Sequence, residues 1–156
     1  MIDLAREADV EVVIMHMLGI PRTMQTDIHY KSFPGDIYEF FEERIQTLED
    51  AGIAPEKIII DPGIGFGKTF DQNLVLINRL DYFKPLGKRI LIGPSRKAFL
   101  GKILNEPNPA NRDVGTLGAV AAAVLMGASI VRVHEVGPTV QVCRVVDAIK
   151  RERVEP

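Results

Sequence analysis

Charged side chains stand where short apolar runs of the sequence end, and their chemistry suits a small polar ligand. Asp61 closes an Ile-Ile-Ile run, where a carboxylate is costly unless it has a fixed partner. It is a candidate acceptor for a ligand's N–H groups, and pairing with Lys97 or a loop amide is the alternative. Arg132 and His134 are two residues apart, so on a strand they share a face and can offer cationic donors to a phosphate. The alternative is that Arg132 pairs with a surface carboxylate and that His134 is a rim histidine whose hydrogen bonds are satisfied within the protein.

The segment Gly93-Pro-Ser-Arg-Lys97 adds a further positive charge at the end of another apolar run. A lysine in this place can hold a carbonyl oxygen or a phosphate. Arg96 and Lys97 are neighbours and can hardly both face one site, so we expect only one of them to point inward.

The glycine-rich segment after Asp61 does not fit a nucleotide-binding P-loop. It ends in Gly67-Lys-Thr, but the position ahead of it that must be glycine is Pro62, which removes an amide donor and restricts the turn. The glycines, Gly65 among them, are more consistent with backbone that passes close to a flat ligand, with Phe66 exposed for stacking.

The first apolar run carries His16 between Met15 and Met17. Alternation along a strand predicts that His16 points toward covering helices as a core histidine, while the methionines line an apolar pocket or belong to the core. His16, His29 and His134 have no Cys or acidic partners at ligand spacing, so we expect no zinc site.

These residues need elements that bring them together. Four β-branched runs, each followed by a loop and a stretch of helical periodicity, lie at Val10–His16, Lys57–Asp61, Arg89–Gly93 and Ser129–His134. This order predicts an α/β fold with a parallel sheet, and the continuously apolar runs predict a sheet buried on both faces. We expect a single domain over residues 1–156, with the candidate residues gathered at the carboxyl ends of the strands.

The helix signals also make testable predictions. They are a helix capped by Asp36 and ended by Gly52, a second capped by Asp71, an almost wholly apolar helix over Val114–Met126 that is buried on all sides, a surface loop at Asn105–Arg112, and a last helix with Pro138 in its first turn.

Composition excludes several classes of function. The chain has 156 residues, 46% of them apolar, which is enough for one core. A net charge of −2 lacks the basic excess of a protein that binds nucleic acid. No apolar run approaches the roughly 18 residues that a membrane helix needs, and the N-terminus has no signal-peptide core. We therefore expect a cytoplasmic protein without nucleic-acid or membrane partners, whose lone Cys143 is a small buried hydrophobe.

Taken together, four ordered motifs resemble the dihydropteroate synthase family of pterin-binding enzymes. They are Met15-His16-Met17-x-Gly-x-Pro-x-Thr-Met-Gln25, Asp61-Pro-Gly-x-Gly-Phe-Gly-Lys68, Gly93-x-Ser-Arg-Lys97 and Arg132-Val-His134. The resemblance covers nearly the whole chain. It implies parallel βα units that form the C-terminal half of a TIM (βα)8 barrel, so the chain is expected to be truncated at its N-terminus.

The resemblance also implies a reaction and a set of site residues. The family condenses 6-hydroxymethyl-7,8-dihydropterin diphosphate with p-aminobenzoate in folate biosynthesis, with Mg²⁺ assisting the diphosphate leaving group. Asp61 would accept from the pterin, Lys97 would contact the pterin and the p-aminobenzoate side, and Arg132 and His134 would hold the diphosphate. Of the residues implied to bind substrate, Lys97, Arg132 and His134 would be catalytic, and the others are Met15, Asp61, Gly65, Phe66, Gly93 and Ser95. A homodimer through the last helices and sensitivity to sulfonamides are implied as well.

The chain departs from the family pattern in two respects. The first-strand loop, the second flexible loop and two further pterin-binding residues of the family are absent, so we expect little or no turnover by this chain alone. Ala98 stands where relatives often have Ser. Two alternatives stay open: a non-catalytic half-barrel that dimerises, and a corrinoid-dependent pterin methyltransferase, against which the Ser-Arg-Lys and Arg-Val-His motifs argue.

Overall fold

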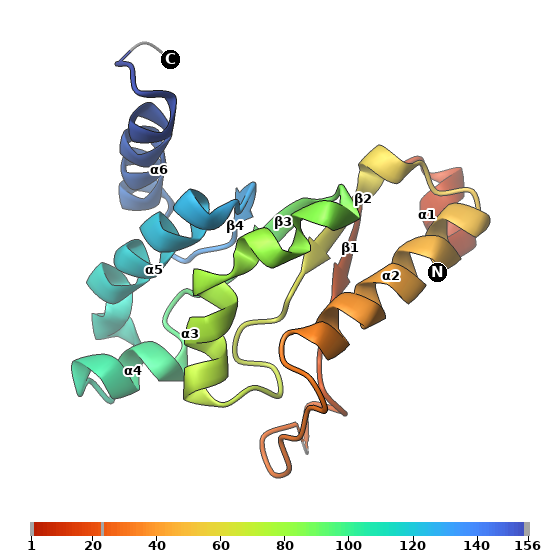
Figure 1. The fold of residues 1–156 in the computed structure, drawn as a ribbon. Coiled ribbons are helices and arrows are strands. Elements are labelled where there is room, and N and C mark those ends of the chain that lie inside the picture. The colour runs from red at the N-terminus through yellow and green to blue at the C-terminus, as the bar shows by residue number, and fades with distance from the viewer. Residues whose placement is uncertain (1, 23, 155–156) are drawn as a thin grey trace.

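The computed structural model describes residues 2–22 and 24–154 and shows a four-stranded parallel sheet connected by helices (Figure 1). The strands are β1 (Val12–Met15), β2 (Ile58–Asp61), β3 (Arg89–Ile92) and β4 (Ile130–Val131), and they lie side by side in chain order. All three strand pairs are parallel, and Met15 lies opposite Asp61. The predicted α/β fold of consecutive βα units is therefore confirmed.

Helices precede the first strand and fill the connections between strands. The α-helices are α1 (Ile2–Glu7), α2 (Gly35–Asp50), α3 (Phe70–Asn78), α4 (Ala98–Leu104), α5 (Asp113–Met126) and α6 (Val136–Arg151). The 3₁₀ helices are η1 (Pro55–Lys57), η2 (Leu80–Leu86) and η3 (Pro109–Arg112). Within the described ranges, no helix combines the length and the apolar character needed to cross a membrane.

One face of the sheet carries the main hydrophobic core. Ile58, Ile60 and Ile92 of the strands pack there with side chains of α2, α3 and α5, among them the fully buried Phe41. The opposite face is less covered, because Val13 of β1 is 47% exposed. The predicted burial of both faces holds along β2 and is wrong for β1, β3 and β4, each of which has residues that are not buried. Right-handed βα connections return their helices on one side of the sheet.

The start of α2 differs from the prediction. The helix begins at Gly35, and Asp36 lies in its first turn, where the carboxylate accepts from the backbone N–H groups of Lys31 and Ser32 at 2.7 and 3.0 Å. Asp36 therefore stabilises the turn that precedes the helix and is not its cap. At the other end, Gly52 follows the helix with a φ of 86°, as predicted.

The cap of α3 is Thr69 instead of Asp71. The Thr69 hydroxyl accepts from the Gln72 N–H at 3.1 Å, and the Gln72 side chain accepts from the Thr69 N–H at 2.9 Å. This reciprocal pair is a capping box, a signal that depends on Thr and Gln three residues apart. Asp71 lies inside the first turn, where its charge still favours the helix N-terminus.

The remaining helix predictions are only partly right. The apolar helix α5 ends at Gly127 as predicted and buries Val120 and Ala123, but Val114 is 83% exposed, so burial on all sides is wrong. The face of α5 that carries Val114 and Leu125 is exposed, with no described residues packed over it. The segment Asn105–Arg112 contains η3, and Arg112 is buried, so it is more than a surface loop. Pro138 lies in the first turn of α6, as predicted.

Candidate active site at the strand ends

Asp61, the last residue of β2, is buried with an exposed fraction of 2%. Its Oδ1 accepts from the Gly63 N–H at 2.8 Å, and its Oδ2 lies 3.3 Å from Nη2 of Arg132. Burial raises the pKa of the Asp61 carboxyl, and the Gly63 N–H and the Arg132 charge oppose that rise. A loop amide and Arg132 are therefore the hydrogen-bond partners of Asp61, in place of the alternative with Lys97.

Arg132 and His134 follow β4 instead of lying within it, because the strand ends at Val131. The prediction of a strand as far as His134 is wrong, since backbone pairing with β3 ends at the Arg132 N–H, which donates to Ile92 O at 2.9 Å. Arg132 pairs with the buried Asp61 and not with a surface carboxylate, and its own side chain is 61% exposed.

His134 is fixed by Ser95, which lies after β3. Ser95 Oγ is 2.7 Å from His134 Nδ1 and also accepts from the His134 backbone N–H at 3.2 Å. These two contacts leave the other ring nitrogen of His134 without a constraint from Ser95. The imidazole can therefore offer Nε2 to a ligand at the rim.

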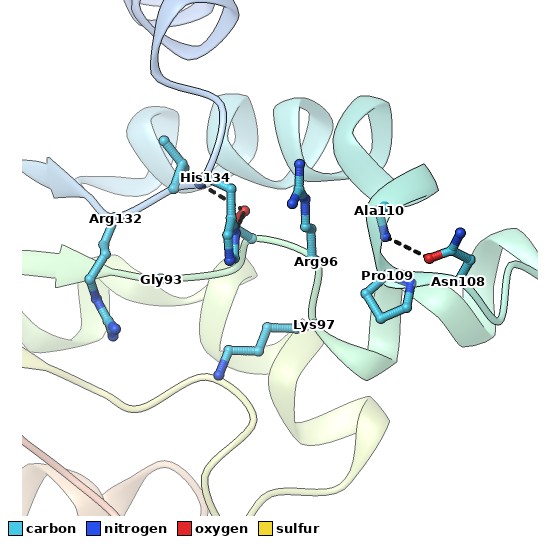
Figure 2. A pocket seen from close by; sticks show the side chains of 10 residues that line it. Gly93, Arg96, Lys97, Asn108, Pro109, Ala110, Arg132 and His134 are labelled. Carbon is cyan, nitrogen blue, oxygen red and sulfur yellow. Dashed lines mark hydrogen bonds between the residues drawn. The ribbon is translucent and has the colours of Figure 1, made fainter.

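Lys97 and Arg96 leave their turn in different directions (Figure 2). Lys97 Nζ lies 4.1 Å from the centre of the Phe66 ring, within the range of a cation–π contact. Burial and the Arg132 charge lower the pKa of Lys97, and Asp61 opposes that shift. Arg96 instead binds Asp113 and Glu135, although it too lines the cavity beside the site. That only one of the two neighbours points inward stays a prediction.

A cavity of about 670 Å³ lies beside these groups (Figure 2). Its lining includes Gly93, Ser95, Lys97, Arg132 and His134. A side chain at Gly93 would bring its Cβ to 3.0 Å from Arg132 Nη2, so the glycine leaves room for the guanidinium. Arg96 lines the cavity as well, so four cationic or potentially cationic side chains surround a space large enough for a small anionic ligand.

The glycine-rich loop lies against the chain itself. Gly63 has a φ of 73°, and a Cβ there would lie 1.9 Å from the carbonyl oxygen of His16. At Gly65 a Cβ would lie 3.1 Å from Lys97 Cδ, and the Gly65 carbonyl accepts from Gln25 at 2.9 Å. These glycines therefore allow close approach to the end of β1 and to Lys97, and the predicted approach to a flat ligand stays a prediction. Thr23 of the first motif lies outside the described residues.

Lys68 is a buried charge that sequence reasoning missed, with an exposed fraction of 2%. Its Nζ lies 3.0 Å from His16 Nδ1 and donates to the Phe66 carbonyl at 3.0 Å. Burial lowers the pKa of Lys68 to about 7, although Asp61 opposes the shift, and burial together with Lys68 lowers the pKa of His16 to about 4. The sequence shows only that Lys68 follows a glycine-rich loop, and nothing local to it indicates burial.

His16 and Met15 occupy the places that strand alternation predicts. His16 is buried and packs edge-on against Phe40 of α2, with ring centres 5.1 Å apart, which confirms a core histidine. Met15 is half-buried and lies opposite Asp61 in the register of β1 and β2. Met15 and Asp61 therefore share the face of the sheet that carries the site.

Charged side chains gathered at the carboxyl ends of parallel strands, beside a cavity, define an α/β enzyme site of the barrel type. The family model described as pterin binding enzyme matches residues 1–134. The chain belongs to the pterin-binding enzyme family.

Relatives of known name point to one activity class within that family. The chain is 44% identical over 140 residues to a dihydropteroate synthase of Synechocystis, covering 90% of this chain and 48% of the relative. It is 41% identical over 147 residues to the dihydropteroate synthase of Escherichia coli, covering 94% of this chain and 52% of the relative. The chain thus spans about half the length of the curated relatives it matches.

Solved structures agree with this comparison. The Yersinia pestis dihydropteroate synthase in a sulfonamide drug complex superposes with a TM-score of 0.93 at 36% identity, over 97% of this chain and 55% of the other. The Xanthomonas albilineans dihydropteroate synthase in complex with 7,8-dihydropteroate gives a TM-score of 0.86 at 35% identity, over 96% of this chain and 54% of the other. These relatives are TIM barrels, so the prediction that the βα units form half of such a barrel is confirmed.

Proposed function

We propose that this chain carries half of a dihydropteroate synthase active site. The reaction joins 6-hydroxymethyl-7,8-dihydropterin diphosphate to p-aminobenzoate and releases diphosphate. The observation that carries the proposal is the buried Asp61, paired with Arg132 at the rim of a cavity that Lys97 and His134 also line. This arrangement offers an acceptor for a pterin next to donors for a diphosphate.

Asp61 is the proposed pterin anchor. Its carboxylate is buried and already oriented by the Gly63 N–H, so it loses little freedom when it accepts from the amino and ring N–H groups of a pterin. Met15, on the same face of the sheet, offers a polarizable surface to the flat ring. Gly65 has no side chain, which leaves room for the Lys97 side chain beside it.

Lys97, Arg132 and His134 are the proposed catalytic residues. The aryl amine of p-aminobenzoate forms a bond to the pterin methylene carbon while the bond from that carbon to the diphosphate oxygen breaks, and the new ammonium loses a proton to water. Negative charge then grows on the leaving diphosphate, where positively charged side chains around the cavity stabilise it. No protein nucleophile is needed, because the neutral amine attacks by itself.

The other site residues support this geometry. Ser95 holds the His134 ring, Gly93 makes room for the Arg132 guanidinium, and Phe66 lies under Lys97 on the proposed p-aminobenzoate side. Neighbouring structures of this family include one with 4-aminobenzoic acid and one with a sulfonamide drug complex. We extend the same aryl-amine site, and sensitivity to sulfonamides, to this chain as part of the proposal.

Mg²⁺ is proposed as the cation that accompanies the diphosphate. The described residues contain no group of three His, Cys, Asp or Glu side chains placed to hold a metal ion, and both carboxylate oxygens of Asp61 already have donors. The donor set of this chain thus does not fit a metal held by the protein itself. Mg²⁺ commonly keeps several waters and binds through substrate phosphates, so we propose that it arrives on the diphosphate.

The second candidate is a non-catalytic half-barrel, and the sparsely covered face of the four-stranded sheet favours it. The sheet face at β1 is open around Val13, as expected for a barrel half without its other strands. Such a chain would bind pterin without turning it over. Catalysis by the chain alone is therefore expected to be weak or absent.

A homodimer through the C-terminal helices is also proposed, in the cytoplasm. Val136, Val145 and Ile149 of α6 and Val114 of α5 are exposed apolar side chains, and such side chains in number mark an interaction surface. Sedimentation of the chain across a range of concentrations tests this. A monomer at every concentration would refute the dimer.

Calorimetric titration of the purified chain with 6-hydroxymethyl-7,8-dihydropterin diphosphate and Mg²⁺ tests the proposed function. We expect binding that is lost in Asp61→Asn, since the amide presents an N–H donor where the pterin needs an acceptor. An Asp81→Asn control, which changes an exposed aspartate of η2, should bind like the unchanged chain. A folded chain that binds no ligand would refute the proposal, and addition of p-aminobenzoate to a binding chain separates the catalytic from the non-catalytic candidate.

A further inference from the structure

We propose that Arg96 is a positioning residue that fixes Lys97 and His134 relative to each other around a diphosphate. This inference rests on the proposed function and adds a residue that does not itself hold the substrate. It is carried by a set of contacts in which one arginine joins three separate segments of the chain.

The guanidinium of Arg96 makes a two-pronged contact with the first residue of α5. Its Nε donates to Asp113 Oδ1 at 2.8 Å and its Nη2 donates to Asp113 Oδ2 at 2.9 Å. The same Nη2 donates to Glu135 Oε1 at 3.0 Å. Only arginine presents donors in a fork that matches a carboxylate in this way. The β3–α4 loop, the start of α5 and the β4–α6 loop are thereby tied to one planar group.

The backbone of Arg96 is fixed as firmly as its side chain. Its φ is 59°, in the left-handed region that a residue with a Cβ rarely adopts. The Arg96 N–H donates to Thr116 Oγ1 at 3.0 Å, and its carbonyl accepts from Nη1 of the buried Arg112 at 3.0 Å. A conformation of this kind persists where surrounding contacts over-determine it. It sets the direction in which Lys97, the next residue, leaves the turn.

His134 is held from two sides by residues of the same turn, Ser95 and Arg96. Glu135, the residue after it, is bound by the Arg96 guanidinium, and Ser95, the residue before Arg96, contacts the ring at Nδ1 at 2.7 Å. The positions of Lys97 and His134 therefore depend on one turn, although they come from different loops. Pairing with two carboxylates also neutralises Arg96, so its charge is directed away from a ligand although the residue lines the cavity.

Two variants separate a positioning role from direct binding of the anion by Arg96. Asp113→Asn removes the charge of the two-pronged partner and one of its two acceptor oxygens, so that Glu135 is the one carboxylate left on the guanidinium. Arg96→Lys keeps the charge but loses the fork. A direct cationic ligand would bind an anion at least as well in Asp113→Asn. A positioning residue predicts weaker binding in both variants.

The experiment titrates each variant with inorganic diphosphate and, separately, with 6-hydroxymethyl-7,8-dihydropterin, which lacks the diphosphate. We expect diphosphate affinity to fall on the order of tenfold in both variants, as for loss of hydrogen bonds to charged groups. Binding of the pterin compound, whose proposed anchor is Asp61 and for which Lys97 is a further contact, should fall clearly less than binding of diphosphate. The matched control is Arg89→Lys, which changes the Arg89–Glu11 pair at the opposite end of β3 and should leave both affinities unchanged.

A second readout does not depend on ligand. The imidazole NMR signals of His134 should shift in Arg96→Lys, which keeps the Asp113 charge that acts on the ring, and stay in place in Arg89→Lys. Unchanged or tighter diphosphate binding with unmoved His134 signals would overturn the positioning role, and so would an equal loss of both ligands, which marks a general structural defect. An unchanged chain that binds neither compound refutes the proposed function instead, and the His134 signals then decide the positioning role alone.

Discussion

Protonation of His16 should destabilise the fold over a defined range of pH. The ring is 6% exposed, packs 5.1 Å from the Phe40 ring centre and lies 3.0 Å from Lys68 Nζ. Burial and the Lys68 charge lower the pKa of His16 from 6.5 to about 4. This lowering corresponds to ~3 kcal/mol of preference for the neutral ring in the folded chain.

The sign follows from the number of protons that each state binds. Between pH 6.5 and about 4 the unfolded chain carries the His16 proton and the folded chain does not. The free energy of unfolding therefore falls as the pH falls through this window, by up to ~3 kcal/mol for this residue. Above pH 6.5 the ring is neutral in both states, and its contribution is constant.

Urea unfolding followed by circular dichroism, at a series of pH values through this window, measures the effect. His16→Asn removes the titrating ring while keeping an oxygen that can accept from Lys68. We expect the stability difference between the unchanged chain and this variant to shift by ~3 kcal/mol across the window. The control is His29→Asn, at an exposed histidine, which should follow the unchanged chain. Parallel curves for the unchanged chain and His16→Asn would refute the reasoning.

Three further changes test the buried lysine, the core and a helix cap. The pKa of Lys68 is lowered from 10.5 to about 7, so between these pH values the unfolded chain binds one more proton than the folded chain and the free energy of unfolding should rise with pH. Lys68→Met should abolish this rise in urea titrations. The same pH dependence in the variant would contradict the prediction. Phe41→Ala, at a fully buried ring, should lower the free energy of unfolding by ~3–5 kcal/mol, while Val114→Ala at an exposed site should change it by less than about 0.5 kcal/mol, and similar losses in both would be evidence against the core described above. Thr69→Ala should cost ~1 kcal/mol through loss of the capping box, and an unchanged urea midpoint would show that Thr69 is not the effective cap.

Local patterns in the sequence were sufficient for the fold class. The β-branched run that ends at Asp61 and the helical periodicity after each run depend on neighbouring residues only, and both reappear as β2 and the following helices. Helix ends were less well predicted, because Asp71 and Thr69 are both acceptable caps and the choice depends on which backbone N–H each side chain reaches. Gly52, the glycine with positive φ after α2, was predicted correctly, because no neighbouring residue is an equally good helix end.

Residue type and position nominated the site, and tertiary structure decided its pairs. Asp61, Lys97, Arg132 and His134 could be chosen from sequence because each lies at or just beyond the end of an apolar run, and parallel strands end at one rim. The pairing of Asp61 with Arg132, 71 residues away, could not, because it depends on the distances between strand ends after the sheet has formed. The burial of Lys68 and the joining of three segments by Arg96 are of the same kind. Sequence sets periodicity and chemistry locally, whereas the partner of a charge is fixed by which distant segments the packed core brings within hydrogen-bonding distance.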